Sequence, residues 1–123
     1  MAAVKGKNTT PELIVRRLVH GLGYRYALHA KRLPGKPDLV FVSRRKVIFV
    51  NGCFWHMHTC RHGKILPATN ADYWQQKRER NAERDRAHIK ALRKDGWRVL
   101  TIWECRTRDV AFLQKQIASF LAQ

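Results

Sequence analysis

Acidic residues are scarce in this chain. Nine Asp and Glu stand against 25 Lys and Arg, which gives the 123 residues a formal net charge of +16. Such an excess of one sign destabilises a compact chain by self-repulsion unless an anionic partner relieves it. We therefore predict that the chain binds nucleic acid rather than being merely basic. An anionic membrane surface is disfavoured, because no basic amphipathic helix has a broad apolar face.

Long hydrophobic runs and a secretion signal are missing as well. No apolar stretch approaches the roughly 18–20 residues that span a bilayer, and the first residues lack the charged, apolar and small segments of a signal peptide. The chain is 45% hydrophobic, which suits one buried core at this length. We expect a single cytoplasmic domain over residues 1–123, with residues 1–8 as a flexible basic arm.

Cysteine is limited to three residues, Cys53, Cys60 and Cys105. An odd number without a secretion signal argues against a disulfide framework. Three thiols and one histidine instead make up the four ligands of a structural zinc site. The histidine is open among His56, His58 and His62, and we favour His58 because the spacing Cys53-x4-His58-x-Cys60 keeps the ligands on one short loop. The alternative is three thiols that are simply buried or free.

Hydrophobic periodicity and turn residues predict a small α/β domain. The expected elements are a helix from 9 to about 21, strands over 24–28, 37–42 and 46–50, a helix from 73 to about 95, a strand over 98–103 and a helix opened by Asp109. Asn70 or Asp72 is the expected cap of the long helix, and residues 43–45 the expected hairpin turn. This order indicates a mixed sheet covered by helices.

Asp38 and His56 are the candidate catalytic residues that follow from their positions. Asp38 opens a predicted strand, and its carboxylate is the hard oxygen ligand that suits Mg²⁺, although an aspartate ending a turn is also common. In phosphodiester hydrolysis such a metal polarises the phosphate and activates water. His56 is a candidate general acid or base, since the ordinary pKa of histidine lies near working pH. Its alternatives are a zinc ligand or a structural hydrogen-bonding residue.

Aromatic and basic side chains indicate how DNA is contacted. Phe54 and Trp55 follow a strand in a loop, and with Trp74 at a helix start they are candidates for a wedge that unstacks base pairs. Core packing is the alternative, and it describes Trp97 and Trp103 better. Basic residues such as Lys77 and Arg78 follow on a polar helical segment, where they either contact phosphates or form a solvated face.

Five motifs, in this order, resemble those of the very-short-patch-repair DNA mismatch endonucleases. They are Leu33-Pro-Gly-Lys-Pro-Asp38, Val47-Ile-Phe-Val-Asn-Gly-Cys-Phe-Trp-His56, Asn81-Ala-Glu-Arg-Asp85, Gly96-Trp-Arg-Val-Leu100 and Trp103-Glu-Cys105. The resemblance runs from about Lys5 to Cys105. It implies a variant of the PD-(D/E)XK, restriction-endonuclease-like fold. It also implies Mg²⁺-dependent nicking on the 5′ side of the thymine in T·G mismatches, which arise when 5-methylcytosine deaminates.

The resemblance also assigns roles by position. It makes Asp38 a Mg²⁺ ligand together with the backbone carbonyl of Val50, His56 the catalytic histidine, and Glu12 the acid that supports the waters of the metal. The structural zinc ligands it implies are Cys53, His58, Cys60 and Cys105. It matches Phe54, Trp55 and Trp74 to the aromatics that intercalate beside the mismatch. We also expect DNA contacts from Lys77, Arg78 and Asn81. We further expect a bacterial, nucleoid-associated monomer that acts on double-stranded DNA, with mismatch-repair proteins as possible partners.

Two departures from the family pattern bear on activity. Asn51 stands where family members often carry a second active-site histidine, and an amide can hydrogen-bond but cannot act as an acid or base. The segment before Lys5 is shorter than usual, so that we expect weaker DNA binding. The alternatives are therefore a restriction-type nuclease of the same fold, or a zinc-stapled DNA-binding module that has lost cleavage.

Overall fold

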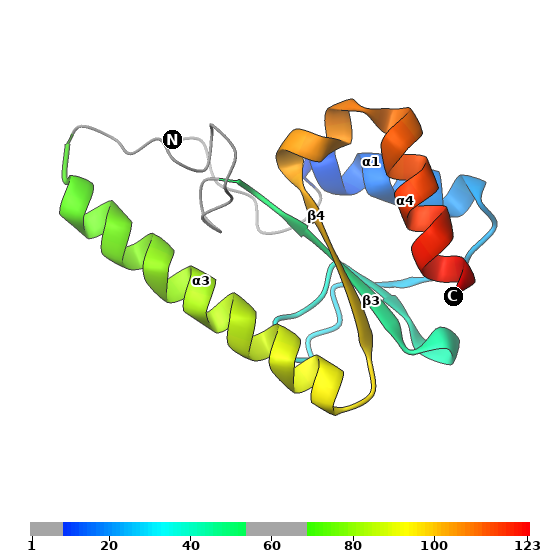
Figure 1. The fold of residues 1–123 in the computed structure, drawn as a ribbon, viewed down its shortest axis with the longest axis horizontal. Coiled ribbons are helices and arrows are strands. Elements are labelled where there is room, and N and C mark those ends of the chain that lie inside the picture. The colour runs from blue at the N-terminus through cyan, green and yellow to red at the C-terminus, as the bar shows by residue number, and fades with distance from the viewer. Residues whose placement is uncertain (1–8, 54–68) are drawn as a thin grey trace.

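A computed structural model describes residues 9–53 and 69–123 of the chain. Its centre is a four-stranded sheet in the order β1–β2–β3–β4, made of β1 (Ala27–Leu28), β2 (Leu39–Phe41), β3 (Lys46–Asn51) and β4 (Arg98–Trp103) (Figure 1). The first three strands are antiparallel neighbours, and β4 runs parallel to β3 with Asn51 opposite Trp103. The expected mixed α/β architecture is thus confirmed, and it fits a restriction-endonuclease-like fold.

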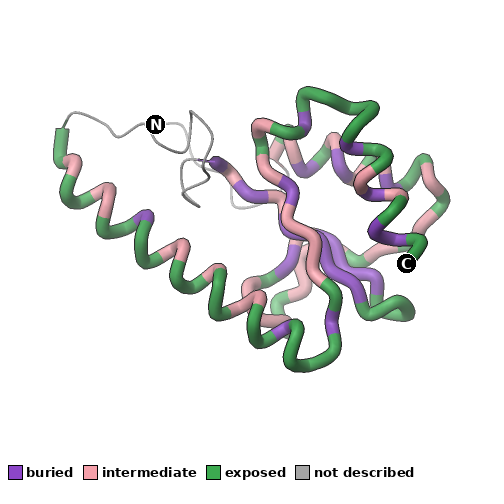
Figure 2. The backbone as a smooth tube through the Cα atoms, viewed as in Figure 1, coloured by how far each residue is buried: buried purple, intermediate pink, exposed green. Residues whose placement is uncertain are grey.

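Helices lie on both faces of the sheet. Two of them, α1 (Thr10–Gly21) and α4 (Val110–Ala122), pack against each other. With one sheet face they enclose the larger core, which is built on Leu39, Ile48, Ile102, Leu113 and Ile117. The third, α3 (Ala71–Lys94), lies against the opposite face through Leu92, which packs with Val40, Val47, Phe49 and Trp97. Figure 2 shows burial concentrated in the strands and an exposed α3 that extends away from them.

Local signals in the sequence place several element ends correctly. Thr9 caps α1 by accepting a hydrogen bond from the backbone N–H of Glu12 at 3.4 Å, and Asp109 caps α4 through Phe112 N–H at 3.1 Å. Gly96 follows α3 with a φ of +90°, the left-handed conformation that commonly ends a helix. Asn70 occupies the capping position of α3, but its side chain makes no capping hydrogen bond.

Two of the predicted strands are shorter than expected. Only Ala27–Leu28 of the segment 24–28 and Leu39–Phe41 of the segment 37–42 are strands. The turn before β3 is a 3₁₀ turn, η1 (Val42–Arg44), closed by Arg45 in the left-handed conformation. A second 3₁₀ segment, η2 (Glu104–Arg108), joins β4 to α4.

Lys46, at the start of β3, is buried instead of solvated. Its Nζ donates hydrogen bonds to the carbonyl oxygens of Phe120, Leu121 and Gln123 at 2.8, 3.0 and 2.6 Å, so it satisfies the end of α4. Burial, with smaller contributions from Arg98 and Arg44, lowers the pKa of Lys46. This cation ties the last helix to the central strand.

Within the described ranges, none of the helices combines the length and the apolar character needed to cross a membrane.

Candidate active site

Side chains from three segments converge at one edge of the sheet. They are Glu12 in the first turn of α1, His29 just after β1 and Asp38 just before β2, and their ligand atoms all lie within 4.8 Å of one another. A helix cap and a strand pairing position these residues. The cap at Thr9 fixes the first turn of α1, and the β1–β2 pairing brings His29 opposite Asp38, where His29 N–H donates to the Asp38 carbonyl at 3.1 Å.

Asp38 is held against the backbone of the neighbouring strand. Its Oδ2 accepts a hydrogen bond from the Val50 N–H at 2.7 Å. Burial raises the pKa of Asp38 from 3.8 to about 6, more strongly than the Val50 hydrogen bond lowers it, and the negative charge of Glu12 raises it further. A cation beside this carboxylate would reverse that cost, because it favours the charged form.

Glu12 is only 2% exposed and lies near two basic side chains as well as Asp38. Its Oε2 lies 2.9 Å from Nε2 of His29 and 3.6 Å from a guanidinium nitrogen of Arg16. Buried charges of this kind persist when they are paired or bind a cation. Glu12 and Asp38 supply the oxygen ligands that hard divalent cations prefer, so the residues present fit a Mg²⁺-type site.

The turn that precedes Asp38 is tightly packed. Gly35 has a φ of +76°, and a Cβ built there would lie 3.0 Å from Cβ of His88 and 3.1 Å from the ring of Phe49. Only glycine meets both conditions without strain. The Pro34-Gly35 turn is thereby fixed between α3 and β3, which in turn positions Asp38.

Comparison with known proteins assigns the chain to a family. The profile of the family described as "DNA mismatch endonuclease Vsr" matches residues 1–62. The type II nicking enzyme V.XorIIP of Xanthomonas oryzae pv. oryzae is 50% identical over 98% of this chain and 88% of its own length. The chain belongs to the Vsr family of DNA mismatch endonucleases.

Two further relatives agree with this assignment. The DNA mismatch endonuclease Vsr of Escherichia coli is 43% identical over 88% of this chain and 69% of its own length. The type II nicking enzyme V.NmeAIP of Neisseria meningitidis is 38% identical over 95% and 83%. The resemblance drawn from the five sequence motifs is thus confirmed.

Part of the zinc site predicted for this Vsr-family chain falls within the described residues. Cys53 is buried and Cys105 half-buried. Each lies two residues past a member of the Asn51–Trp103 pair, so the parallel register of β3 and β4 carries both cysteines to the same edge of the sheet. His58 and Cys60, as well as His56 and His62, lie outside the described residues. The zinc site stays a prediction.

The expected DNA contacts on α3 differ in their surroundings. Trp74 is half-buried, packs edge-on against Tyr73 at 5.2 Å between ring centroids, and has Lys77 Nζ 5.8 Å from its own centroid. Asn81 is half-buried and accepts a hydrogen bond from Arg84 at 2.9 Å. Arg78 is only 2% exposed, so it departs from the solvated face expected of this segment. The remaining expected contacts, Phe54 and Trp55, lie outside the described residues.

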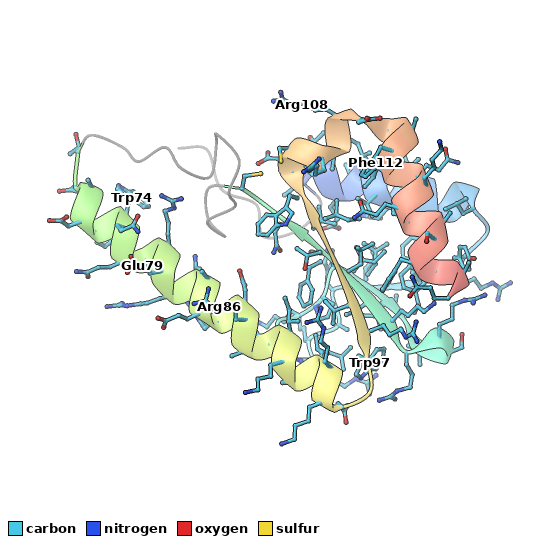
Figure 3. All side chains as sticks on the ribbon, viewed as in Figure 1. Trp74, Glu79, Arg86, Trp97, Arg108 and Phe112 are labelled. Carbon is cyan, nitrogen blue, oxygen red and sulfur yellow. The ribbon has the colours of Figure 1, made fainter. Side chains whose placement is uncertain are left out.

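Figure 3 shows long polar side chains along the half of α3 that projects beyond the sheet, with Trp74 near its start and Glu79 and Arg86 farther along. The short arm expected over residues 1–8 is outside the described residues.

His29 is the member of this site that sequence reasoning missed. No motif around it stood out, because it follows a strand of only two residues. The available signal was its position across a hairpin from Asp38, which requires the β1–β2 register to be known. Asn51, by contrast, was expected at the site, and it is buried at the end of β3 directly after Val50.

Proposed function

We propose that this chain is a Mg²⁺-dependent endonuclease that nicks DNA on the 5′ side of the thymine in a T·G mismatch. The observation that carries the proposal is the pair of carboxylates, buried Glu12 and half-buried Asp38, brought together with His29 in a chain of the Vsr family. Burial and the neighbouring charge of Glu12 raise the pKa of Asp38, and carboxylates perturbed in this way cluster at functional sites.

The residues of the site have distinct parts in this reaction. Bound Mg²⁺ would polarise the scissile phosphate, lower the pKa of water and stabilise the leaving oxygen. Asp38 would hold the ion directly, and Val50 N–H keeps its carboxylate in place at 2.7 Å. The backbone carbonyl of Val50 is the second proposed ligand. Glu12 would accept hydrogen bonds from water bound to the ion.

Proton transfer falls to His56, which we propose as the catalytic histidine on the family pattern. Asn51, buried one residue beyond Val50, donates or accepts hydrogen bonds but cannot exchange a proton at neutral pH. We therefore propose a reaction that relies on one histidine, and a lower rate than a chain with histidine at both positions.

Binding combines charge with aromatic contacts. Lys77 and Asn81, on the projecting half of α3, are proposed to contact the mismatched region, while Phe54, Trp55 and Trp74 open the base stack. Zinc held by Cys53, His58, Cys60 and Cys105 would fasten the wedge-bearing segment to the end of the sheet. Because Arg78 is buried, a structural part in α3 suits it better than a phosphate contact.

A covalently closed plasmid with a single T·G mismatch tests the proposal. With Mg²⁺, we expect conversion to the open-circular form, no linear product, and no conversion of the T·A plasmid. Asp38→Asn should abolish nicking, whereas Asp95→Asn, the same change at an exposed residue of the loop after α3, should retain it.

Linear product from matched DNA would favour the restriction-type alternative. Tight mismatch binding without any nicking would favour the DNA-binding module, and Asn51→His would be the next variant.

A further inference from the structure

His29 has no role in the function proposed so far, although it contacts both carboxylate-bearing segments. We propose that His29 is a positioning residue of the metal site, whose imidazole fixes the Glu12 carboxylate in the orientation at which Glu12 and Asp38 serve the same divalent cation. The inference rests on the proposed function, because it refines the same site.

The side chain of His29 makes the first of the two connections. Its Nε2 lies 2.9 Å from Oε2 of Glu12, a hydrogen-bond distance, while Arg16 stands farther from the same oxygen at 3.6 Å. The 2.9 Å separation is that of a hydrogen bond in which the Nε2–H tautomer of His29 donates to the Glu12 carboxylate oxygen. Ordering a freely rotating glutamate side chain costs conformational entropy. The hydrogen bond from the imidazole orders Glu12 in advance, so that this cost is not added when the cation binds.

The backbone of His29 makes the second connection. Its N–H donates to the carbonyl of Asp38 at 3.1 Å, one position beyond the Leu28–Leu39 pair that ends β1. Its φ is +48°, in the left-handed region that side chains rarely adopt outside turns. Conformations of this kind persist where the surrounding structure enforces them, and they cluster at functional sites. One residue thus ties the segment of Asp38 to the side chain of Glu12.

Positioning explains the geometry better than direct metal binding. Imidazole suits Zn²⁺, Cu²⁺ and Fe²⁺, whereas Mg²⁺ takes oxygen ligands. The nitrogen that faces the cluster is already within hydrogen-bond distance of Glu12. Residues that orient metal ligands from outside typically change metal affinity by 10–100-fold when they are removed.

Two substitutions distinguish a positioning role of His29 from direct metal binding. Asn accepts the left-handed backbone of position 29 but ends one bond short of the imidazole Nε2, so His29→Asn keeps the fold and removes the donor. Gln places an N–H donor at the same number of bonds as Nε2, so His29→Gln should restore the contact with Glu12. His20→Gln is the matched control, since His20 is exposed at the end of α1.

Metal affinity is read without catalysis, from the loss of the free-ion signal of Mn²⁺ in electron paramagnetic resonance. We expect His29→Asn to weaken Mn²⁺ binding roughly tenfold, His29→Gln to stay within about threefold of the wild type, and His20→Gln to leave it unchanged. In nicking, the Mg²⁺ concentration for half-maximal rate should rise for His29→Asn while KM for mismatched DNA stays constant. Thermal unfolding of each variant checks that the fold is intact.

Wild-type Mn²⁺ affinity in His29→Asn would overturn the inference. Equal loss in His29→Gln and His29→Asn would also overturn it, because the ring itself would then be a ligand. If the wild type fails to nick a T·G duplex, the proposed function fails, and the Mn²⁺ series still decides the role of His29.

Discussion

Asp38→Asn should make the protein more stable while it removes nicking. The folded state raises the pKa of Asp38 from 3.8 to about 6. At about 1.4 kcal/mol per unit, the ionised carboxylate destabilises the fold by roughly 3 kcal/mol at pH 7. Asparagine carries no charge, and its side-chain oxygen still accepts the hydrogen bond from Val50 N–H. Desolvating the neutral amide costs less free energy than desolvating the charged carboxylate, but the cost is not zero. We therefore expect the free energy of unfolding to rise by about 1–3 kcal/mol, or the Tm by several degrees.

The raised pKa of Asp38 also predicts how the stability of the fold changes with pH. Folded Asp38 binds its proton more tightly than the unfolded chain does, so the stability associated with its protonated form is fully present below pH 3.8 and is lost as pH rises through about 6. The advantage of Asp38→Asn should therefore be complete at pH 7 and above and should shrink as pH falls from 6 to 4. Mg²⁺ should raise the Tm of the wild type at pH 7.5 but not that of the variant.

Urea denaturation and thermal unfolding of the wild type, Asp38→Asn and Asp95→Asn at pH 4.5, 6 and 7.5 measure this. Asp95→Asn corrects for the change of net charge, since that side chain is 76% exposed and pairs weakly with Arg45 at 3.7 Å. An Asp38→Asn protein that is no more stable than the wild type at pH 7.5, or whose advantage does not change with pH, would refute the account of a desolvated carboxylate.

Three other outcomes are expected from the contacts of Lys46, the proposed zinc site and the net charge. Lys46→Met removes three donors to the carbonyls at the end of α4 and should cost about 1–3 kcal/mol in urea denaturation; an unchanged midpoint would contradict that role. Cys105→Ser should lower zinc content, measured by atomic absorption, together with Tm, and normal zinc occupancy would remove Cys105 from the proposed ligands. Affinity for DNA should fall steeply with salt through counterion release, and a flat salt response would remove the argument from net charge.

Much of the fold follows from local signals in the sequence. The run Arg98–Trp103 was predicted with its exact bounds because β-branched and apolar residues stand between Gly96 and the polar η2 segment. The starting residues of α1 and α4 follow from the N-terminal caps at Thr9 and Asp109. The hairpin strands were overestimated, because a strand ends where its partner stops pairing, and this is a property of two segments rather than of one.

Residues governed by tertiary contacts escaped prediction. Lys46 is buried because it meets the last carbonyls of α4, which lie more than seventy positions away. His29 joins the site through a register that no local pattern contains. Glu12 and Asp38 were predicted, by the resemblance and by the strand pattern, and the structure brings them together. The roles assigned to His56, His58, Cys60, Phe54 and Trp55 stay predictions.

Mapping the nick on an end-labelled duplex tests the central claim most directly. Each strand of a T·G duplex and of its T·A control is labelled in turn, incubated with Mg²⁺ or with EDTA, and resolved on a denaturing gel. The account predicts one product, cut immediately 5′ of the mismatched thymine, only with Mg²⁺ and only in the T·G duplex. Equal cutting of both duplexes, or cutting that survives EDTA, would contradict it.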